Sequence, residues 1–260
     1  MLKTRLIAVI IVRHGQVVQS VNFKHTNVIH YDVIHAIEAF NDWAVDELVL
    51  LNVSRKKDSQ DQFLSVVESA SKYCFIPLAV GGWIDSPEYA QQILRSGADK
   101  MILNSALVND PELVKELSSR YGAQCIVGSI DIKKSDSNQS TVWIDRGRFD
   151  TGKNPEHWAN QIQELGVGEI LLNSIDHDGA RRGYDLENLE KICKVVKIPV
   201  IAFGGVFDWE HLLAGVMAGA DAVAAANIFH YTEQSTKKAK RFLIDNNIDV
   251  RRSGALEVQH

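Results

Sequence analysis

The stretch IPLAVGGWIDSPEYAQQILRSGADKMILNSAL, residues 76–107, is repeated in outline as IPVIAFGG and AGADAVAAANIF, residues 198–205 and 218–229. Each copy contains an apolar run that ends in Gly-Gly, and a second apolar run that begins after Gly-Ala-Asp. A further pair, DELVLLNV at residues 46–53 and GEILLNSI at residues 168–175, recurs at nearly the same spacing. Because both motifs recur together, the sequence predicts two similar halves of alternating strands and helices.

The same alternation continues along the rest of the chain. Helix signals lie between the apolar runs, such as Ser86 before Pro87 and the segment 110–122 that ends at Gly122. The runs are too apolar for a sheet with one face in water, which favours parallel strands covered by helices. The sequence therefore predicts an α/β fold, a (β/α)8 TIM barrel of two half-barrels in a single domain over residues 1–252. The eight predicted strands are residues 5–13, 47–53, 76–82, 100–105, 125–132, 169–176, 198–205 and 222–229.

Two segments fall outside this alternation. Residues 133–155 interrupt it after the fifth strand, and we expect them to form an added loop or hairpin at the mouth of the barrel. Residues 253–260, SGALEVQH, do not fit the repeat, and we interpret them as a tail added to the native chain.

Composition excludes several classes of protein. The 260 residues are 45% hydrophobic, enough for one large core, and carry a net charge of −5. No basic stripe for nucleic acid and no apolar run of membrane-spanning length is found, so we expect a cytoplasmic protein. The three cysteines are far apart and the histidines lack metal-ligand spacing, so no disulfide, metal or cofactor is predicted.

Two glycine pairs follow predicted strands in the two halves. Gly81 and Gly82, with Asn104 and Ser105, form one candidate anion site, because glycines let backbone N–H groups approach a phosphate. Gly204, Gly205 and Asn227 form its counterpart. Two such sites facing each other suit a substrate phosphorylated at both ends, whereas glycines that merely turn the chain would bind nothing.

Charged residues occupy the starts of four predicted strands. Strand alternation places Arg5 on the same inward face as Ile11, and Lys100 and Glu169 follow the same rule on their own strands. Glu47 is the repeat counterpart of Glu169. Because buried charges are costly unless they are paired, we expect these two bases and two acids to form a salt-bridged plug.

Carboxylates also lie at the C-terminal end of the sixth predicted strand. Asp176 and Asp178, in SIDHDGA, would lie at the C-terminal end of the barrel, where they could orient a substrate hydroxyl or amine. Capping of a turn is the competing interpretation.

The motifs FIPLAVGG (75–82), SGADKMILNSALVNDPEL (96–113), GVGEILLNSIDHDGARRGYD (166–185), FGGV (203–206) and AGADAVAAANIFH (218–230) together resemble one family. Over about residues 1–252 the chain is similar to the HisF family, the cyclase subunit of imidazole glycerol phosphate synthase, a lyase. The resemblance implies a HisH-like glutaminase at the N-terminal barrel face, whose ammonia passes through the barrel to a phosphorylated small molecule. It also implies that Asn173, Asp178 and Gly179 join the phosphate sites, and that Arg5, Glu47, Lys100 and Glu169 form the ammonia gate.

The chain departs from the family at the mouth of the barrel. The resemblance implies an acid and a base on the first and fifth strands, and these positions are Ile11 and Asp131. An isoleucine transfers no proton, so ordinary cyclase activity is not expected. Gln19 replaces a family lysine, and Trp83 and Phe203 replace a glycine and a serine beside the two anion sites.

Three hypotheses follow for function. The first is a diverged HisF-like subunit of a glutamine amidotransferase complex that uses or relays ammonia, a type associated with amidino sugars of surface polysaccharides and a third, ATP-using amidotransferase. The second is a genuine imidazole glycerol phosphate synthase subunit in which another group, such as Asp176, replaces the missing acid. The third is an inert scaffold that activates the glutaminase.

Overall fold

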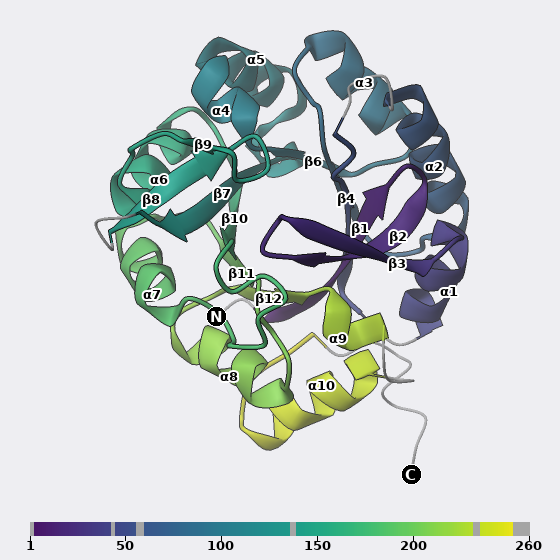
Figure 1. Ribbon diagram of the computed structural model, residues 1–260, viewed down its shortest axis with the longest axis vertical. Helices are drawn as coiled ribbons and strands as arrows, with labels where there is room; N and C mark the ends of the chain where they lie inside the picture. The colour runs from purple at the N-terminus through teal and green to yellow at the C-terminus, as the bar shows by residue number, and fades with distance from the viewer. Residues whose placement is uncertain (1–2, 43–44, 56–59, 136–138, 231–234, 252–260) are drawn as a thin grey trace.

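A closed barrel of eight parallel strands forms the centre of the protein (Figure 1). The computed structural model describes residues 3–42, 45–55, 60–135, 139–230 and 235–251, so the tail at 253–260 lies outside the described residues. Strand β12 pairs with β1, and β7 pairs with β10, which closes the barrel and confirms the predicted (β/α)8 fold. In barrel order the strands are β1 (Arg5–Arg13), β4 (Glu47–Asn52), β5 (Leu78–Gly81), β6 (Lys100–Leu103), β7 (Ile126–Lys134), β10 (Glu169–Ser174), β11 (Val200–Phe203) and β12 (Ala222–Ala225).

Helices surround the barrel, and several begin at the residues that the sequence predicts. Ser86 accepts a hydrogen bond from the Tyr89 amide, with Pro87 in the first helical turn, and Asp110 caps the next long helix in the same way. No helix of the described part is long and apolar enough to cross a membrane. The helices are α1 (Val33–Asp42), α2 (Gln60–Tyr73), α3 (Pro87–Arg95), α4 (Ser105–Asn109), α5 (Pro111–Tyr121), the 3-10 helix η2 (Ala123–Cys125), α6 (Pro155–Glu164), α7 (Leu186–Val195), α8 (Trp209–Met217), α9 (Asn227–His230) and α10 (Ser235–Asp245).

The core has two parts, separated by the wall of strands. Leu6, Ala8 and Ile10 of β1 face the helices, whereas Ile7 and Val9 face the barrel interior, as the two-residue period of a strand requires. Small and β-branched residues from the other strands fill the interior around them. Alternation along β1 therefore places Ile11 at the upper end of the interior and Arg5 at the lower end.

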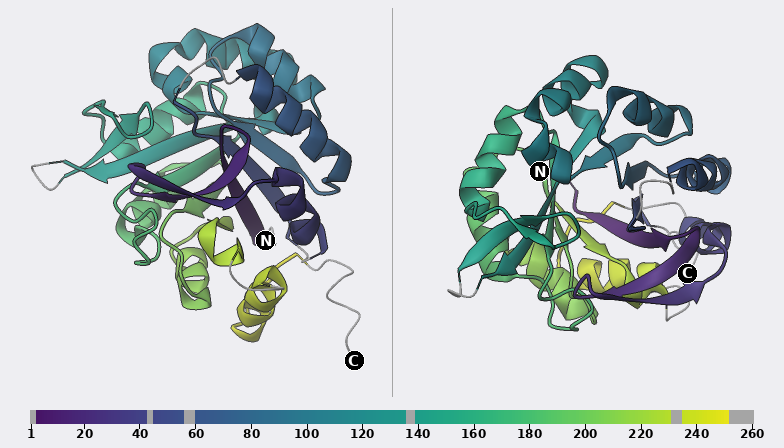
Figure 2. Two further views of the ribbon diagram at one scale, coloured as in Figure 1. Left: turned by 45° about the vertical axis from the view of Figure 1, so that its right-hand side comes forward. Right: turned by 45° about the horizontal axis from the view of Figure 1, so that its top comes forward.

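Two antiparallel extensions follow the first and fifth barrel strands. Strands β8 (Ser140–Ile144) and β9 (Phe149–Asp150) extend β7 and project beyond the helices (Figure 2), as predicted for residues 133–155. Strands β2 (Gln16–Val21) and β3 (His25–His30) extend β1, which the sequence did not lead us to expect. The two extensions lie at corresponding places in the two halves of the barrel.

Six of the predicted strands are one to four residues too long at their C-terminal ends, and two of these predictions run into a helix. Strand β6, the fourth strand of the barrel, ends at Leu103, and α4 begins at Ser105. The sequence predicted that this strand continues to residue 105. Strand β12 ends at Ala225 and α9 begins at Asn227, whereas a strand was predicted to residue 229. Helix α4 follows Asn104 directly and helix α9 begins at Asn227, so both asparagines lie at helix N-termini rather than within strands.

Candidate active site at the barrel mouth

Two adjoining cavities open at the C-terminal ends of the barrel strands. The larger has a volume of about 490 Å³ and is lined by Asp131 and by both members of the Gly81–Gly82 pair. The smaller has a volume of about 350 Å³ and is lined by Ile11. Their linings have Phe23, Leu51, Val53, Arg146, Asn173 and Phe203 in common.

Asp131 is the buried carboxylate of the larger cavity. Its carboxylate accepts hydrogen bonds from Asn104 Nδ2 at 3.1 Å and Asn173 Nδ2 at 3.3 Å. Burial raises the pKa of Asp131 to about 7, the amide of Asn173 and the hydroxyl of Ser129 lower it in part, and the nearby charge of Asp178 raises it further. A carboxyl group with this pKa both takes up and releases a proton near neutral pH, as acid–base catalysis requires.

The position that corresponds to Asp131 on the first strand carries an apolar side chain. Ile11 is 5% exposed and lies among apolar neighbours in the barrel interior. Phe203, 6% exposed, lines both cavities. Trp83 lines the larger cavity, where its Nε1 donates to Ser54 O at 2.9 Å and the Arg146 guanidinium lies 4.9 Å from its ring centre. The first strand thus contributes no acid to the mouth, and Trp83 and Phe203 add bulk to it.

Asp178 holds the β2–β3 extension over the mouth. Its Oδ2 accepts hydrogen bonds from Ser20 Oγ at 2.6 Å and from the Phe23 amide at 3.2 Å, and its carbonyl oxygen accepts from the Asn22 amide at 2.9 Å. Burial raises the pKa of Asp178, and its two hydrogen bonds counteract the rise in part. This carboxylate fixes the β2–β3 turn to the loop after β10.

The turns of the two extensions meet above the barrel. Phe23 lies in the β2–β3 turn and Gly147 in the β8–β9 turn, and a Cβ atom added to Gly147 would lie 3.4 Å from the Phe23 ring. Phe23 and Arg146 both have positive φ angles, 57° and 60°. Both turns therefore form part of the wall of the mouth.

The remaining predicted residues of the sixth-strand loop lie at its edge. Asp176 accepts a hydrogen bond from the Lys134 amide at 2.8 Å and lines neither cavity. Gly179 has a φ angle of 68°, and a Cβ there would lie 2.8 Å from Ser20 O. Asp176 is thus placed to fix the end of β7, and Gly179 allows the close approach of the β2–β3 extension.

The two predicted anion sites differ in their surroundings. Gly81, Gly82, Asn104 and Ser105 all line the larger cavity. Gly204, Gly205 and Asn227 line neither cavity. Gly205 packs so closely on Gly183 that a Cβ would lie 2.2 Å from Gly183 O, and the buried Asn227 Oδ1 has no hydrogen-bond partner among the described residues. Only the first site opens directly onto a described cavity.

A ring of four charges lies at the opposite end of the barrel. Lys100 Nζ lies 2.9 Å from Glu47 Oε1 and 2.9 Å from Glu169 Oε2. Arg5 bridges the same two acids, through Nη1 to Glu47 Oε2 at 2.8 Å and through Nη2 to Glu169 Oε1. Each base therefore contacts both acids, in the arrangement that strand alternation predicts.

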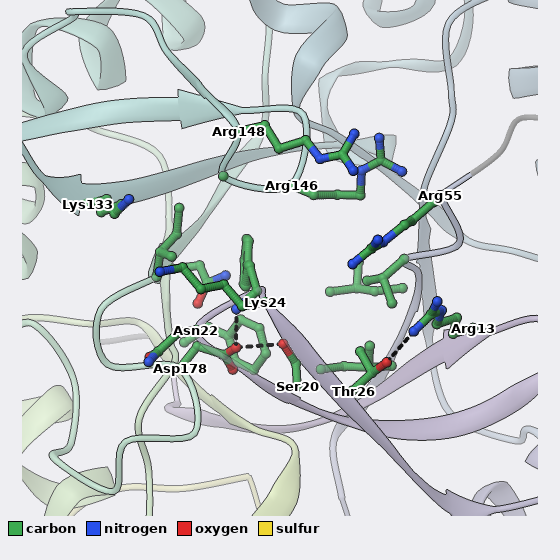
Figure 3. Close-up of a pocket in the computed structure, with 18 residues that line it drawn as sticks. Arg13, Ser20, Asn22, Lys24, Thr26, Arg55, Lys133, Arg146, Arg148 and Asp178 are labelled. Carbon is green, nitrogen blue, oxygen red and sulfur yellow. Dashed lines mark hydrogen bonds between the residues drawn. The ribbon is translucent and has the colours of Figure 1, made fainter.

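The smaller cavity carries a set of basic residues that sequence reasoning missed (Figure 3). Arg13 and Lys133 lie two residues after Ile11 and Asp131, so strand alternation could have found them. The other four lie on turns and loops, where the sequence has no such period. The full set, which we term the basic cluster, is Arg13, Lys24, Arg55, Lys133, Arg146 and Arg148. No group of three metal-ligating side chains suited to a metal ion occurs in the described part of the chain.

Comparison with known proteins identifies the family. Residues 5–235 match the family described as "Histidine biosynthesis protein". The "Imidazole glycerol phosphate synthase subunit HisF" of Bacillus cereus (strain G9842) is 40% identical over 252 residues, which cover 96% of this chain and 100% of the relative. The chain belongs to the HisF family. Its barrel has Asp131 on the fifth strand, the charged ring at the opposite end and Ile11 on the first strand.

Proposed function

We propose that this chain is the synthase subunit of a glutamine-dependent complex. It receives ammonia from a HisH-like glutaminase at the N-terminal barrel face and uses it at the opposite mouth to amidate a phosphorylated small molecule. The observation that carries the proposal is the charged ring of Arg5, Glu47, Lys100 and Glu169, which is intact in a chain whose first-strand position is Ile11.

Closing a barrel with buried charged side chains costs free energy, because each charge loses its water. Ions removed from water destabilise a fold unless their partners compensate, and apolar residues of similar volume often do as well or better. Glu47 and Glu169 have side chains only 3% and 9% exposed. A closure of movable side chains suits a gate for a small neutral molecule, and the apolar interior above it suits ammonia better than ammonium.

Apolar side chains surround the ring end of the barrel. Tyr73 and Val195 end α2 and α7, Met217 ends α8, and Phe75 lies in the connection to β5, so all four lie where the chain enters a barrel strand. Their exposed fractions are 44%, 38%, 74% and 85%. Aromatic residues and methionine are enriched at protein interfaces, which supports a partner at this face.

Proton transfer at the mouth falls to Asp131. Its pKa of about 7 allows it to take up a proton from an attacking amine or to return one to a leaving group. Asn104 and Asn173 hold its two oxygens in place. In this proposal Asp131 works without a second carboxylate on the first strand.

The product that we propose is an amidino sugar of a surface polysaccharide, formed with a third, ATP-using amidotransferase. This step follows the resemblance to diverged HisF-like subunits and the presence of Ile11. The second candidate is the cyclase reaction of imidazole glycerol phosphate synthase, which the 40% identity to the Bacillus cereus HisF subunit favours. The two candidates differ in whether the chain turns over the histidine-pathway bisphosphate.

The ammonia route is tested with a HisH-type glutaminase from the same organism. The variant Glu47→Gln/Lys100→Gln removes one acid and one base from the ring, and Glu187→Gln/Lys191→Gln removes an exposed pair of the same kind on α7. We expect the ring variant to keep glutaminase binding but to release more ammonia into the medium per product formed, and the α7 variant to match the native complex. Failure of the glutaminase to bind, or equal ammonia release by all three proteins, would exclude the gate.

The scaffold hypothesis predicts a different result for Asp131→Asn. An inert scaffold would allow the full complex to form product at the native rate. We expect a loss of about 10²-fold or more, as for removal of a general acid or base.

A further inference from the structure

The smaller cavity has an unusual balance of charge. Six basic side chains, the basic cluster, line it, whereas Asp178 is the one carboxylate in its lining as the structure describes it. Figure 3 shows Arg55, Arg146 and Arg148 across the cavity from Asp178. Charges of one sign in a partly enclosed space raise the local potential and attract ions of opposite sign.

The carboxylates of the described residues neutralise only part of the cluster. Asp178 is engaged by Ser20 and Phe23. Asp145, which pairs with Arg146 at 2.5 Å and with Arg148 at 3.9 Å, lies outside the lining of this cavity.

Four members of the cluster have no carboxylate partner within the described part of the chain. Among the residues that the structure describes, no ion pair is formed by Arg13, Lys24, Arg55 or Lys133. Lys133 Nζ lies 4.2 Å from the centre of the Trp143 ring, which attracts the ammonium group but supplies no negative charge.

Unused hydrogen-bonding groups lie in the same lining. Arg13 donates from Nη1 to Thr26 Oγ1 at 2.6 Å, but its buried Nε has no partner among the described residues. Asn173 is 4% exposed, and its Oδ1 also has no partner in the described part of the chain. Buried polar atoms of this kind are costly unless a ligand or water satisfies them.

We infer that this cavity binds the diphosphate group of a substrate that is an organic diphosphate ester. Four or more cations within about 350 Å³ exceed what one phosphate group neutralises, and arginine forks match phosphate oxygens in pairs. Ile11, Leu51 and Phe203 provide an apolar floor for the organic part. The site is separate from the Gly81–Gly82 loop, which lines the larger cavity alone.

Both halves of the barrel contribute to this site. Arg13 ends β1 and Lys24 lies in the β2–β3 turn, whereas Lys133 belongs to β7 and Arg146 and Arg148 to the β8–β9 turn. The contact between the two turns brings the cations together. The inference rests on the proposed function only in assigning the diphosphate to the substrate of this mouth.

Calorimetric titration of the isolated chain with inorganic pyrophosphate and with orthophosphate tests the site. We expect pyrophosphate to bind at least about tenfold more tightly than orthophosphate, because it engages more of the cluster. The double variant Arg13→Gln/Arg55→Gln should weaken pyrophosphate binding by about tenfold or more. The control Arg95→Gln/Arg241→Gln removes the same charge from exposed positions on α3 and α10 and should bind as the native chain does.

Three results would overturn the inference: no binding of pyrophosphate, equal affinity for the two anions, or equal losses in the two double variants. Thermal unfolding of each variant verifies that it is folded. Because no glutaminase is present, failure here leaves the ammonia proposal standing. Conversely, Glu47→Gln/Lys100→Gln should bind pyrophosphate normally even if ammonia transfer proves to be absent.

Discussion

Asp131 and Asn173 face each other in register on the neighbouring strands β7 and β10, and the Asn173 amide donates to the Asp131 carboxylate at 3.3 Å. Asn104, which directly follows β6, approaches the same carboxylate from the other side. Neutral amides hold this group but do not supply the positive charge that would keep it ionised. Burial therefore dominates, and the pKa of Asp131 rises to about 7.

The raised pKa predicts how pH affects stability. An unfolded aspartate loses its proton near pH 4, whereas folded Asp131 keeps it until about pH 7. The unfolded state therefore binds fewer protons across this window, and the free energy of unfolding falls as the pH rises through it. Asp131→Asn has no such proton, so its stability relative to the native chain should increase from pH 4 to about pH 7 and then level off, by at most ~4 kcal/mol.

Urea unfolding of both proteins between about pH 4 and pH 8 measures this difference. Buried carboxylates that do not interact with Asp131, such as Asp46, affect both proteins equally and cancel in the comparison. A difference that does not change with pH would mean that Asp131 titrates as an exposed aspartate does.

The charged ring predicts an unequal cost for single and paired substitutions. Lys100→Gln alone leaves Glu47 and Glu169 to share Arg5, and we expect a loss of about 3–5 kcal/mol in the free energy of unfolding. Glu47→Gln/Lys100→Gln restores the balance of charge and should lose less than Lys100→Gln alone. On the exposed Glu187–Lys191 pair, Lys191→Gln should have little effect on the free energy of unfolding, because water screens the pair. Additive losses in the ring would show that its charges do not interact.

A side chain at position 179 should displace the β2–β3 extension. An alanine Cβ there would lie 2.8 Å from Ser20 O, so Gly179→Ala should push the extension away from Asp178. The amides of Asn22 and Phe23, which donate to Asp178, should then exchange hydrogen about tenfold faster. Gly152 has a φ angle of 67°, nearly the same as that of Gly179, but nothing lies within 4 Å of a Cβ added there. The control variant Gly152→Ala should therefore leave this exchange unchanged. Equal exchange in both variants would contradict the role of Gly179.

The sequence predicts the barrel and its lower ring because both depend on simple periods. Alternation along β1 places Arg5 and Ile11 on one face, and the repeat relates Glu47 to Glu169. The structure confirms the ring through contacts among residues that lie as much as 164 positions apart.

The β2–β3 extension and the basic cluster could not be predicted in the same way. His14 and Gly15, both with positive φ, form the tight turn after β1, but the following QVVQSV is too short and mixed to separate a strand from a helix. Lys24, Arg55 and Arg148 read as ordinary exposed charges. The meeting of two turns from different halves of the chain brings Lys24 and Arg148 to the cavity beside Arg55, and no local pattern records that contact.

The effect of Ile11 on turnover separates the two candidate functions. Loss of one member of an acid–base pair costs about 10²- to 10⁴-fold in rate, so we expect little or no turnover of the histidine-pathway bisphosphate by the native chain with saturating ammonium salt. Ile11→Asp should restore weak turnover at most, because Trp83 and Phe203 still line the mouth. The triple variant with Trp83→Gly and Phe203→Ser should gain more, and the Trp83 φ angle of 59° suits glycine. Ile11→Asn is the matched control, since it is polar and similar in size but transfers no proton, and it should be no more active than the native chain. Native turnover within about tenfold of the Bacillus cereus HisF subunit would exclude the diverged function and establish the cyclase reaction instead, because it would mean that the chain needs no acid at Ile11.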